Sequence, residues 1–267
     1  MLTENQWVTR FLVTPIKDKM RLGLGLEQQM VLPDCLSLTF VSSSYYKPLN
    51  RSTSLSEVRP RPLQIVTSNF DQFEYIQDQI LHFFKKGRLV SAEALAPNAI
   101  SWIEDFISFA TKNEIYAPLM SFLEYAIMLD NVNFRGASHP HFLGSLFLHF
   151  NPNDSQFDFF VSIIHESAHQ ELFLINFVDR LVVEKYDFQL IHAPYQNKLR
   201  PPIGRLHSAH ALFRMIQFVQ IFDATNEKLN FFVSKFNDNL SSLDEKELTD
   251  FGRHLLKGVY EPFAKTL

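Results

Sequence analysis

Proline placement sets the strongest limit on how this 267-residue chain can fold. No proline occurs between Pro152 and Pro194, and none occurs between Pro202 and Pro262. Because proline breaks a helix interior, these two intervals can hold long uninterrupted helices. Glycine is also scarce, since 8 residues are too few for an all-β protein with a tight turn about every ten residues. The sequence therefore predicts a mainly α (α+β) fold with a small β element.

The spacing of apolar residues locates the expected elements. Residues 1–66 are rich in Ser and Thr, and Leu38–Val41 and Leu63–Thr67 have the pattern of strands. After residue 67, apolar residues recur with the period of helices. Because no long Gly/Ser linker divides the chain, we expect one domain over residues 1–267, with an extended strand-loop segment (residues 1–66) and a helical segment (residues 67–267). The expected helices cover residues 69–87, 98–111, 115–128, 157–181, 205–223, 227–236 and 244–256, and a further strand covers residues 144–150.

Composition and charge exclude several classes of protein. The net charge is −4, so no basic excess is available to neutralise the phosphates of a nucleic acid. Cys35 is the only cysteine, which excludes an intramolecular disulfide and a multi-cysteine metal site. The first residues lack the apolar run of a signal peptide, and no run of eighteen apolar residues could cross a membrane. We therefore expect a soluble, cytoplasmic protein without nucleic-acid or membrane partners.

One pentapeptide has the composition of a metal site: His165-Glu166-Ser167-Ala168-His169, an H-E-x-x-H motif. Residues i and i+4 of a helix lie one turn apart on the same face, so both imidazoles can bind one metal ion. Glu166 is rotated by about 100° from His165, which places it beside the metal, where it can orient or deprotonate a bound water. The alternative is a pair of core histidines bonded to other side chains. We favour a metal site, because buried histidines need partners.

The third ligand must come from further along the chain. The metzincin continuation would require Gly and His where this chain has Leu172 and Ile175, so that class is rejected. A gluzincin would supply a Glu from a following helix, and Glu184 is the nearest candidate. Glu184 falls at the expected end of the motif helix beside a lysine, which is more typical of a solvated charge.

His207 is the favoured third ligand. It lies just inside the helix expected after Pro201-Pro202-Ile203-Gly204, and the fixed approach of this segment can direct a side chain toward the motif helix. His210 lies one turn further along the same face, and His192 falls in the irregular connection before it. Both remain alternatives.

Three segments together resemble a known family. They are the strand opening Gly144–Leu148 (G-x-x-x-L), the motif His165–His169, and the R-P-x-x-G-x-x-H segment Arg200–His207. This combination is similar to the HExxH-motif peptide-modification proteins, which include α-ketoglutarate-dependent HExxH-type peptide β-hydroxylases found with ribosomally made peptide natural products. The similar stretch covers residues 144–219.

The resemblance implies a non-haem Fe(II)/2-oxoglutarate-dependent dioxygenase, an oxidoreductase that uses O₂ to hydroxylate the β-carbon of a residue in a peptide substrate. It also assigns the metal-ligand role to His165, His169 and His207. Three imidazoles do not by themselves select the reaction, because they suit zinc hydrolysis equally well. A zinc metallopeptidase with Glu166 as general base is therefore the alternative. A non-catalytic helical protein with a structural metal, closed by a fourth protein ligand, is the third hypothesis.

The oxygenase hypothesis also requires a cation for the distal carboxylate of 2-oxoglutarate. Arginine binds carboxylates through two parallel hydrogen bonds. Arg214 lies seven residues after His207, on the same helical face, and is the first candidate. Arg200 and Arg205, from the approach to that helix, are the alternatives.

Overall fold

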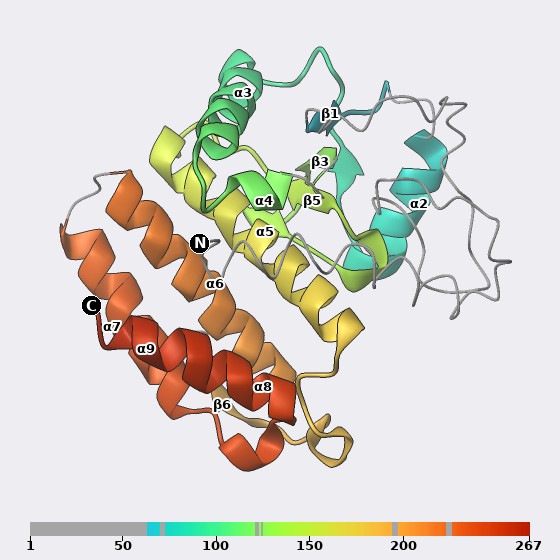
Figure 1. Ribbon diagram of the computed structural model, residues 1–267. Coiled ribbons are helices and arrows are strands. Elements are labelled where there is room, and N and C mark those ends of the chain that lie inside the picture. The colour runs from blue at the N-terminus through green and yellow to red at the C-terminus, as the bar shows by residue number, and fades with distance from the viewer. Residues whose placement is uncertain (1–62, 70–72, 121–122, 124, 194–196, 223–225) are drawn as a thin grey trace, which may run out of the picture. The chain divides into compact units, whose positions relative to one another are not determined.

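The computed structural model describes residues 63–69, 73–120, 123, 125–193, 197–222 and 226–267 (Figure 1). Over these residues the protein is mainly α-helical with small sheets, as predicted. The strand expected at residues 38–41 and most of the extended segment expected over residues 1–66 lie outside the described residues. The chain divides into two compact units, the first ending at Gln170 and the second beginning at Glu171. The single domain expected over residues 1–267 stays a prediction.

The first unit contains, within the described residues, a five-stranded mixed sheet. Its parallel strands are β1 (Gln64–Val66), β3 (Tyr125–Asp130) and β5 (Ser145–Leu148), with β3 in the middle. Two short antiparallel strands, β2 (Arg88–Leu89) and β4 (Gly136–Ala137), pair with β3 and β5. The expected strands at residues 63–67 and 144–150 are thereby confirmed.

One face of this sheet is covered by α2 (Phe73–Phe84). Ile127 of β3 pairs in register with Val66 of β1 and Phe147 of β5, so the three side chains share a face. Ile76 and Ile80 of α2 are fully buried in the same apolar cluster. The helix expected at residues 69–87 is confirmed, and its two isoleucines, four residues apart on one face, pack on the sheet.

The opposite side of the sheet carries α3 (Pro97–Lys112), the short α4 (Ala117–Met120) and the first turns of α5 (Gln156–Val178) (Figure 1). Phe106 of α3 packs against Phe160 of α5, with ring centroids 5.5 Å apart. The helices expected at residues 98–111 and 157–181 are confirmed. Helix α5 contains the H-E-x-x-H motif, so this packing helps to fix the helix that carries the candidate site.

The helix expected at residues 115–128 is wrong. Among the described residues of that range only α4 is helical, and Tyr125–Asp130 forms the central strand β3. The run Tyr-Ala-Ile-Met-Leu is buried throughout, because β3 is covered on both faces. A short continuous apolar run of this kind fits either a buried helix or a buried parallel strand, so periodicity could not separate them.

Two side chains fix the position of α5 in the first unit. Ser155 caps the helix: its Oγ accepts a hydrogen bond from the Asp158 N–H at 3.1 Å and donates to the Asp158 carboxylate at 2.6 Å. Fifteen residues after Ser155, Gln170 accepts from the Gly144 N–H and donates to the Ser145 carbonyl, both at 3.0 Å. The buried Gln170 amide therefore attaches α5 directly to the start of β5.

The second unit is mostly helical in its described residues. The connection predicted to be irregular contains a two-stranded antiparallel hairpin, in which Ile191 pairs with Arg200. The following helix begins at Pro202 rather than Arg205, because proline is favourable in a first helical turn. The elements are η2 (Glu184–Tyr186), β6 (Ile191–Ala193), β7 (Lys198–Arg200), α6 (Pro202–Ile221), α7 (Asn226–Ser241), η3 (Glu245–Glu247), α8 (Asp250–Leu255), the π-helical η4 (Leu256–Tyr260) and α9 (Glu261–Ala264).

Helix α6 is the central element of the second unit. From Arg205 to Val219 every residue except His207 is buried. Phe213 of α6 packs on Tyr260 of η4, with ring centroids 5.7 Å apart, and α7 lies along α6 (Figure 1). The helix predicted at residues 244–256 is interrupted: η3 precedes α8, and the helical run then continues through η4 into α9.

Candidate metal centre

The two histidines of the H-E-x-x-H motif face each other on α5. The Nε2 atoms of His165 and His169 lie 3.0 Å apart, and the two rings meet edge to face with centroids 4.6 Å apart. This is the arrangement that the i, i+4 spacing predicts. The same distance permits an N–H···N hydrogen bond between the rings. The structure therefore brings together two nitrogen donors that can share either a proton or a metal ion.

Burial keeps His165 in the form that binds metals. Desolvation lowers the pKa of His165 to about 4, although 21% of its side-chain surface is accessible to solvent. The imidazole is therefore neutral at pH 7, and a neutral ring nitrogen can donate its lone pair without first losing a proton.

Glu166 lies beside this pair and is held by β4 and the residue after it. Its Oε1 is 3.9 Å from the His165 Nε2, and only 6% of the residue is exposed. Burial raises the pKa of Glu166 to about 7, and a hydrogen bond with Ser138 partly opposes the shift. A Cβ atom at Gly136 would come within 2.7 Å of the Glu166 Cγ, so the absence of a side chain there allows the close approach. Sequence reasoning identified Glu166 but missed Gly136 and Ser138, whose positions depend on the pairing of β4 with β5.

His207 lies on α6 against the continuation of α5. Its ring packs on Phe173, with centroids 4.6 Å apart. Phe173 is four residues after His169, one turn further along the same face of α5. His207 is also the half-buried exception in the otherwise buried run of α6. These observations place His207 against the part of α5 that follows Gln170, and its role as a ligand stays a prediction.

The alternative third ligands are placed less favourably. His192 is exposed on β6, and its Nε2 is 2.8 Å from the Asn197 Oδ1. Glu184 is exposed in η2. Both ring nitrogens of His210 are engaged, since Nε2 contacts Glu171 and Nδ1 contacts Tyr260, each at 2.8 Å. Within the described residues, no three His, Cys, Asp or Glu side chains form a group arranged to hold a metal. The complete ligand set stays a prediction.

Two of the three candidate arginines are engaged in buried ion pairs. Arg214 is 1% exposed, and its Nε and Nη2 donate to the two oxygens of Glu171 at 2.8 and 2.5 Å. Arg205 is fully buried, and its Nη2 donates to Glu247 at 2.6 Å. The prediction that Arg214 binds a cosubstrate carboxylate is therefore not favoured, because Glu171 already occupies its guanidinium.

Arg200 is the remaining candidate. It ends β7 two residues before α6 begins and is half-buried. Its Cβ and Cδ lie 3.5 Å from the position that a Cβ of Gly204 would take, so the side chain lies along the first turn of α6. Among the described residues, no carboxylate or hydrogen-bond partner pairs with its guanidinium.

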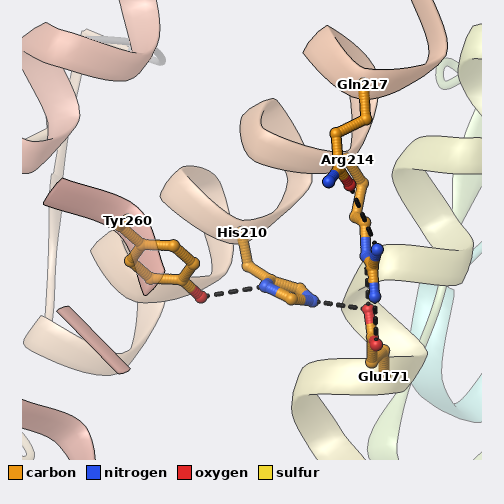
Figure 2. A network of polar contacts seen from close by, with 5 residues as sticks. All are labelled: Glu171, His210, Arg214, Gln217 and Tyr260. Atoms are coloured by element: carbon orange, nitrogen blue, oxygen red, sulfur yellow. Dashed lines mark hydrogen bonds and ion pairs between the residues drawn. The ribbon is translucent and has the colours of Figure 1, made fainter. Parts of the chain in front are cut away.

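Glu171 is a buried charge that sequence reasoning missed. Figure 2 shows its carboxylate between Arg214 and His210, with Tyr260 and Gln217 at the two ends of the network. Burial opposes its ionisation, but the charges of Arg214 and His210 hold the pKa of Glu171 well below its usual range. The sequence did contain a signal, because Glu171 is a charged residue within an apolar helix. Buried charges are nearly always paired, so this position predicts a charged partner.

Comparison with known proteins identifies no relative: no family model matches the chain, and no curated protein of similar sequence was found. None of the helices formed by the described residues combines the length and apolarity needed to traverse a bilayer. The functional argument therefore depends on the residues of the site.

Proposed function

We propose that this protein is an Fe(II)/2-oxoglutarate-dependent dioxygenase that hydroxylates the β-carbon of a residue in a ribosomally made peptide. The observation that carries the proposal is the pair of Nε2 atoms of His165 and His169, 3.0 Å apart on one face of α5. The similarity of the Arg200–His207 segment to the peptide β-hydroxylases supports the reaction class.

The two nitrogens, 3.0 Å apart, are close enough to bind one metal ion together. Non-haem iron oxygenases hold the metal by two histidines and a third protein ligand and keep open positions for the cosubstrate. His207, packed on Phe173 one turn beyond His169, is the proposed third ligand.

Arg200 is the proposed partner of 2-oxoglutarate. A bound 2-oxoglutarate would present a distal carboxylate that the protein must neutralise. The guanidinium of Arg200 has no partner among the described residues and can offer two parallel N–H groups, and Arg200 lies seven residues before His207. Iron, 2-oxoglutarate and O₂ supply the oxidising power, and the products are hydroxylated peptide, succinate and CO₂. Glu166 would orient a ligand or a water from its position beside His165.

A direct assay tests this proposal through Arg200. Protein loaded with Fe(II) is supplied with 2-oxoglutarate under air, with and without a peptide library, and we expect succinate and a mass gain of one oxygen atom. Arg200→Ala should raise the 2-oxoglutarate concentration needed for half-maximal succinate formation by about tenfold or more, because a charge-assisted bond worth roughly 1.5–3 kcal/mol is lost. Lys198→Ala, on the same strand and exposed, is the matched control and should be unchanged. Succinate formation that does not depend on Arg200 would remove this residue from the proposal.

A zinc metallopeptidase is the second candidate, and Glu166 is the observation that favours it. A carboxylate with a pKa near 7, 3.9 Å from a ligand nitrogen, is suited to take a proton from a metal-bound water. In such an enzyme Glu166→Gln should reduce the rate by on the order of 10²–10⁴. In the hydroxylase the loss should be much smaller, because no proton transfer to Glu166 drives the reaction. Zinc-dependent peptide cleavage without succinate, abolished by Glu166→Gln, would select the peptidase.

The third hypothesis, a structural metal without catalysis, receives less support. It requires a fourth protein ligand, and the predicted candidates were His192 and His210. His192 is engaged with Asn197, and His210 is engaged with Glu171 and Tyr260. A site with three protein ligands and open positions is typical of catalytic metals.

A further inference from the structure

The segment that leads into β6 and through β7 carries the three most exposed large apolar side chains of the described residues. Phe188, in the turn before β6, is 92% exposed, Leu190 is 56% exposed, and Leu199 of β7 is 61% exposed. All three belong to the second unit. Single exposed apolar side chains are normal on a protein surface, but several large ones within one short segment indicate an interaction surface.

The pairing register shows which side of the β6–β7 hairpin is open. His192 pairs with Leu199, so these two side chains share a face, and both are exposed. On the other face, Ala193 of β6 is buried and Ile191 is half-buried. The hairpin therefore has one face that is covered and one outer face, and Leu199 lies on the outer face.

The hairpin also leaves strand edges open (Figure 1). Among the described residues, β6 and β7 pair with each other and with no other strand. Each strand therefore has one edge whose N–H and C=O groups are not used in pairing between strands. An extended chain can add to such an edge as a further strand. Its main-chain hydrogen bonds then provide affinity, and its alternate side chains contact the apolar residues beside the edge.

The exposed apolar area is too small for a stable dimer of this chain. At the observed exposures, Phe188, Leu190 and Leu199 together offer on the order of 400 Å² per copy, so a symmetric pair would bury about 800 Å². Stable protein–protein interfaces bury about 1,200–2,000 Å². A second copy is therefore not the occupant that this surface fits.

The charges of this segment do not favour a membrane surface either. Sites for anionic lipids typically contain clusters of about 4–8 basic residues. Here the exposed Lys185 and Lys198 are accompanied by the exposed Glu184, and the whole chain has a net charge of −4. An extended peptide needs neither a basic cluster nor a large apolar area, because it gains main-chain hydrogen bonds from a strand edge.

We propose that the β6–β7 hairpin is a docking surface for an extended peptide, which adds to a free strand edge and packs apolar side chains on Phe188, Leu190 and Leu199. The inference goes beyond the proposed hydroxylase reaction, because docking requires no metal and involves the second unit alone. Such a surface selects peptides by the pattern of their apolar residues rather than by the residue at which any chemistry occurs.

Peptide selection on metal-free protein tests the surface, so the result does not depend on the proposed metal centre. A displayed library of random peptides is selected on wild-type protein and counter-selected on the double variant Phe188→Ser/Leu199→Ser. We expect enriched sequences with apolar residues at alternate positions. The most enriched peptide, labelled with a fluorophore, should bind about tenfold or more weakly to each single variant in anisotropy titrations, because one apolar contact is lost.

Two controls separate this surface from general stickiness. Phe231→Ser removes another exposed apolar side chain of the second unit, 52% exposed on α7, and should keep the wild-type affinity. Two further versions of the peptide carry N-methyl groups on one or the other set of alternate backbone amides. Only one set faces the strand edge, so one version should bind at least about tenfold more weakly than the other. Melting temperatures show that the protein variants, all at exposed positions, remain folded.

Other results overturn the inference. If no selected peptide depends on Phe188 and Leu199, or if Phe231→Ser loses as much affinity as Leu199→Ser, the hairpin is not the docking surface. Equal affinities of the two N-methylated peptides exclude addition to a strand edge. Without peptide binding, sedimentation with equimolar phosphatidylcholine–phosphatidylserine vesicles that Phe188→Ser abolishes would assign the surface to a membrane. A dimer that Leu199→Ser dissociates would assign it to a second copy of the chain.

Discussion

Replacing either His165 or His169 with alanine should abolish stoichiometric metal retention. The two Nε2 atoms, 3.0 Å apart, are the pair of donors that the motif contributes, and removing one leaves a site with at most two of the three proposed ligands. Removing one ligand lowers the affinity for the metal by orders of magnitude, because fewer bonds then hold the ion. We expect less than about one tenth of the wild-type metal content after dialysis, measured by elemental analysis.

His192→Ala is the matched control for this experiment, because His192 is exposed on β6 and engaged with Asn197. It should retain full metal content. Melting temperatures of all variants show whether α5 remains folded. If both motif variants keep one metal per chain while folded, the metal is bound elsewhere and the H-E-x-x-H interpretation is wrong.

The sequence was sufficient to predict the local features of the site. The i, i+4 spacing of His165 and His169, the Ser155 cap and the absence of proline all act within one helix, so they follow from local rules. Local rules also predicted the main helices and the two strands that flank β3, namely β1 and β5. The prediction of His207 also began locally, from a proline-initiated helix; the helix is confirmed, and the ligand role of His207 stays a prediction.

The rest of the site depends on contacts between distant segments. Arg214 was predicted to bind a cosubstrate because it shares a helical face with His207, but that face also meets Glu171, 43 residues away in the chain. No pattern in the sequence pairs these two residues. Gly136 and Ser138 reach Glu166 only through strand pairing, and β3 was mistaken for a helix because it is buried on both faces.

Glu166→Gln should stabilise the metal-free protein, and the stabilisation should grow with pH. Burial raises the pKa of Glu166 from its ordinary value of 4.5 to about 7, so the folded state holds a proton that the unfolded state releases. Wild-type stability is therefore lost progressively as the pH rises from about 4.5 to about 7, and the loss is complete above that range. A shift of this size corresponds to roughly 3 kcal/mol.

The glutamine variant has no proton to release, and its amide oxygen can still accept the hydrogen bond from Ser138. Urea unfolding at pH about 5 and about 8 should therefore show similar stabilities for wild type and variant at the lower pH, and a more stable variant at the higher pH. Glu104→Gln, an exposed position on α3 of the same unit, should follow the wild-type profile. Parallel profiles for wild type and Glu166→Gln would mean that the Glu166 carboxylate is solvated. A solvated carboxylate would also not have the raised pKa that a general base beside the metal requires, so the same measurement would remove the main support for the peptidase hypothesis.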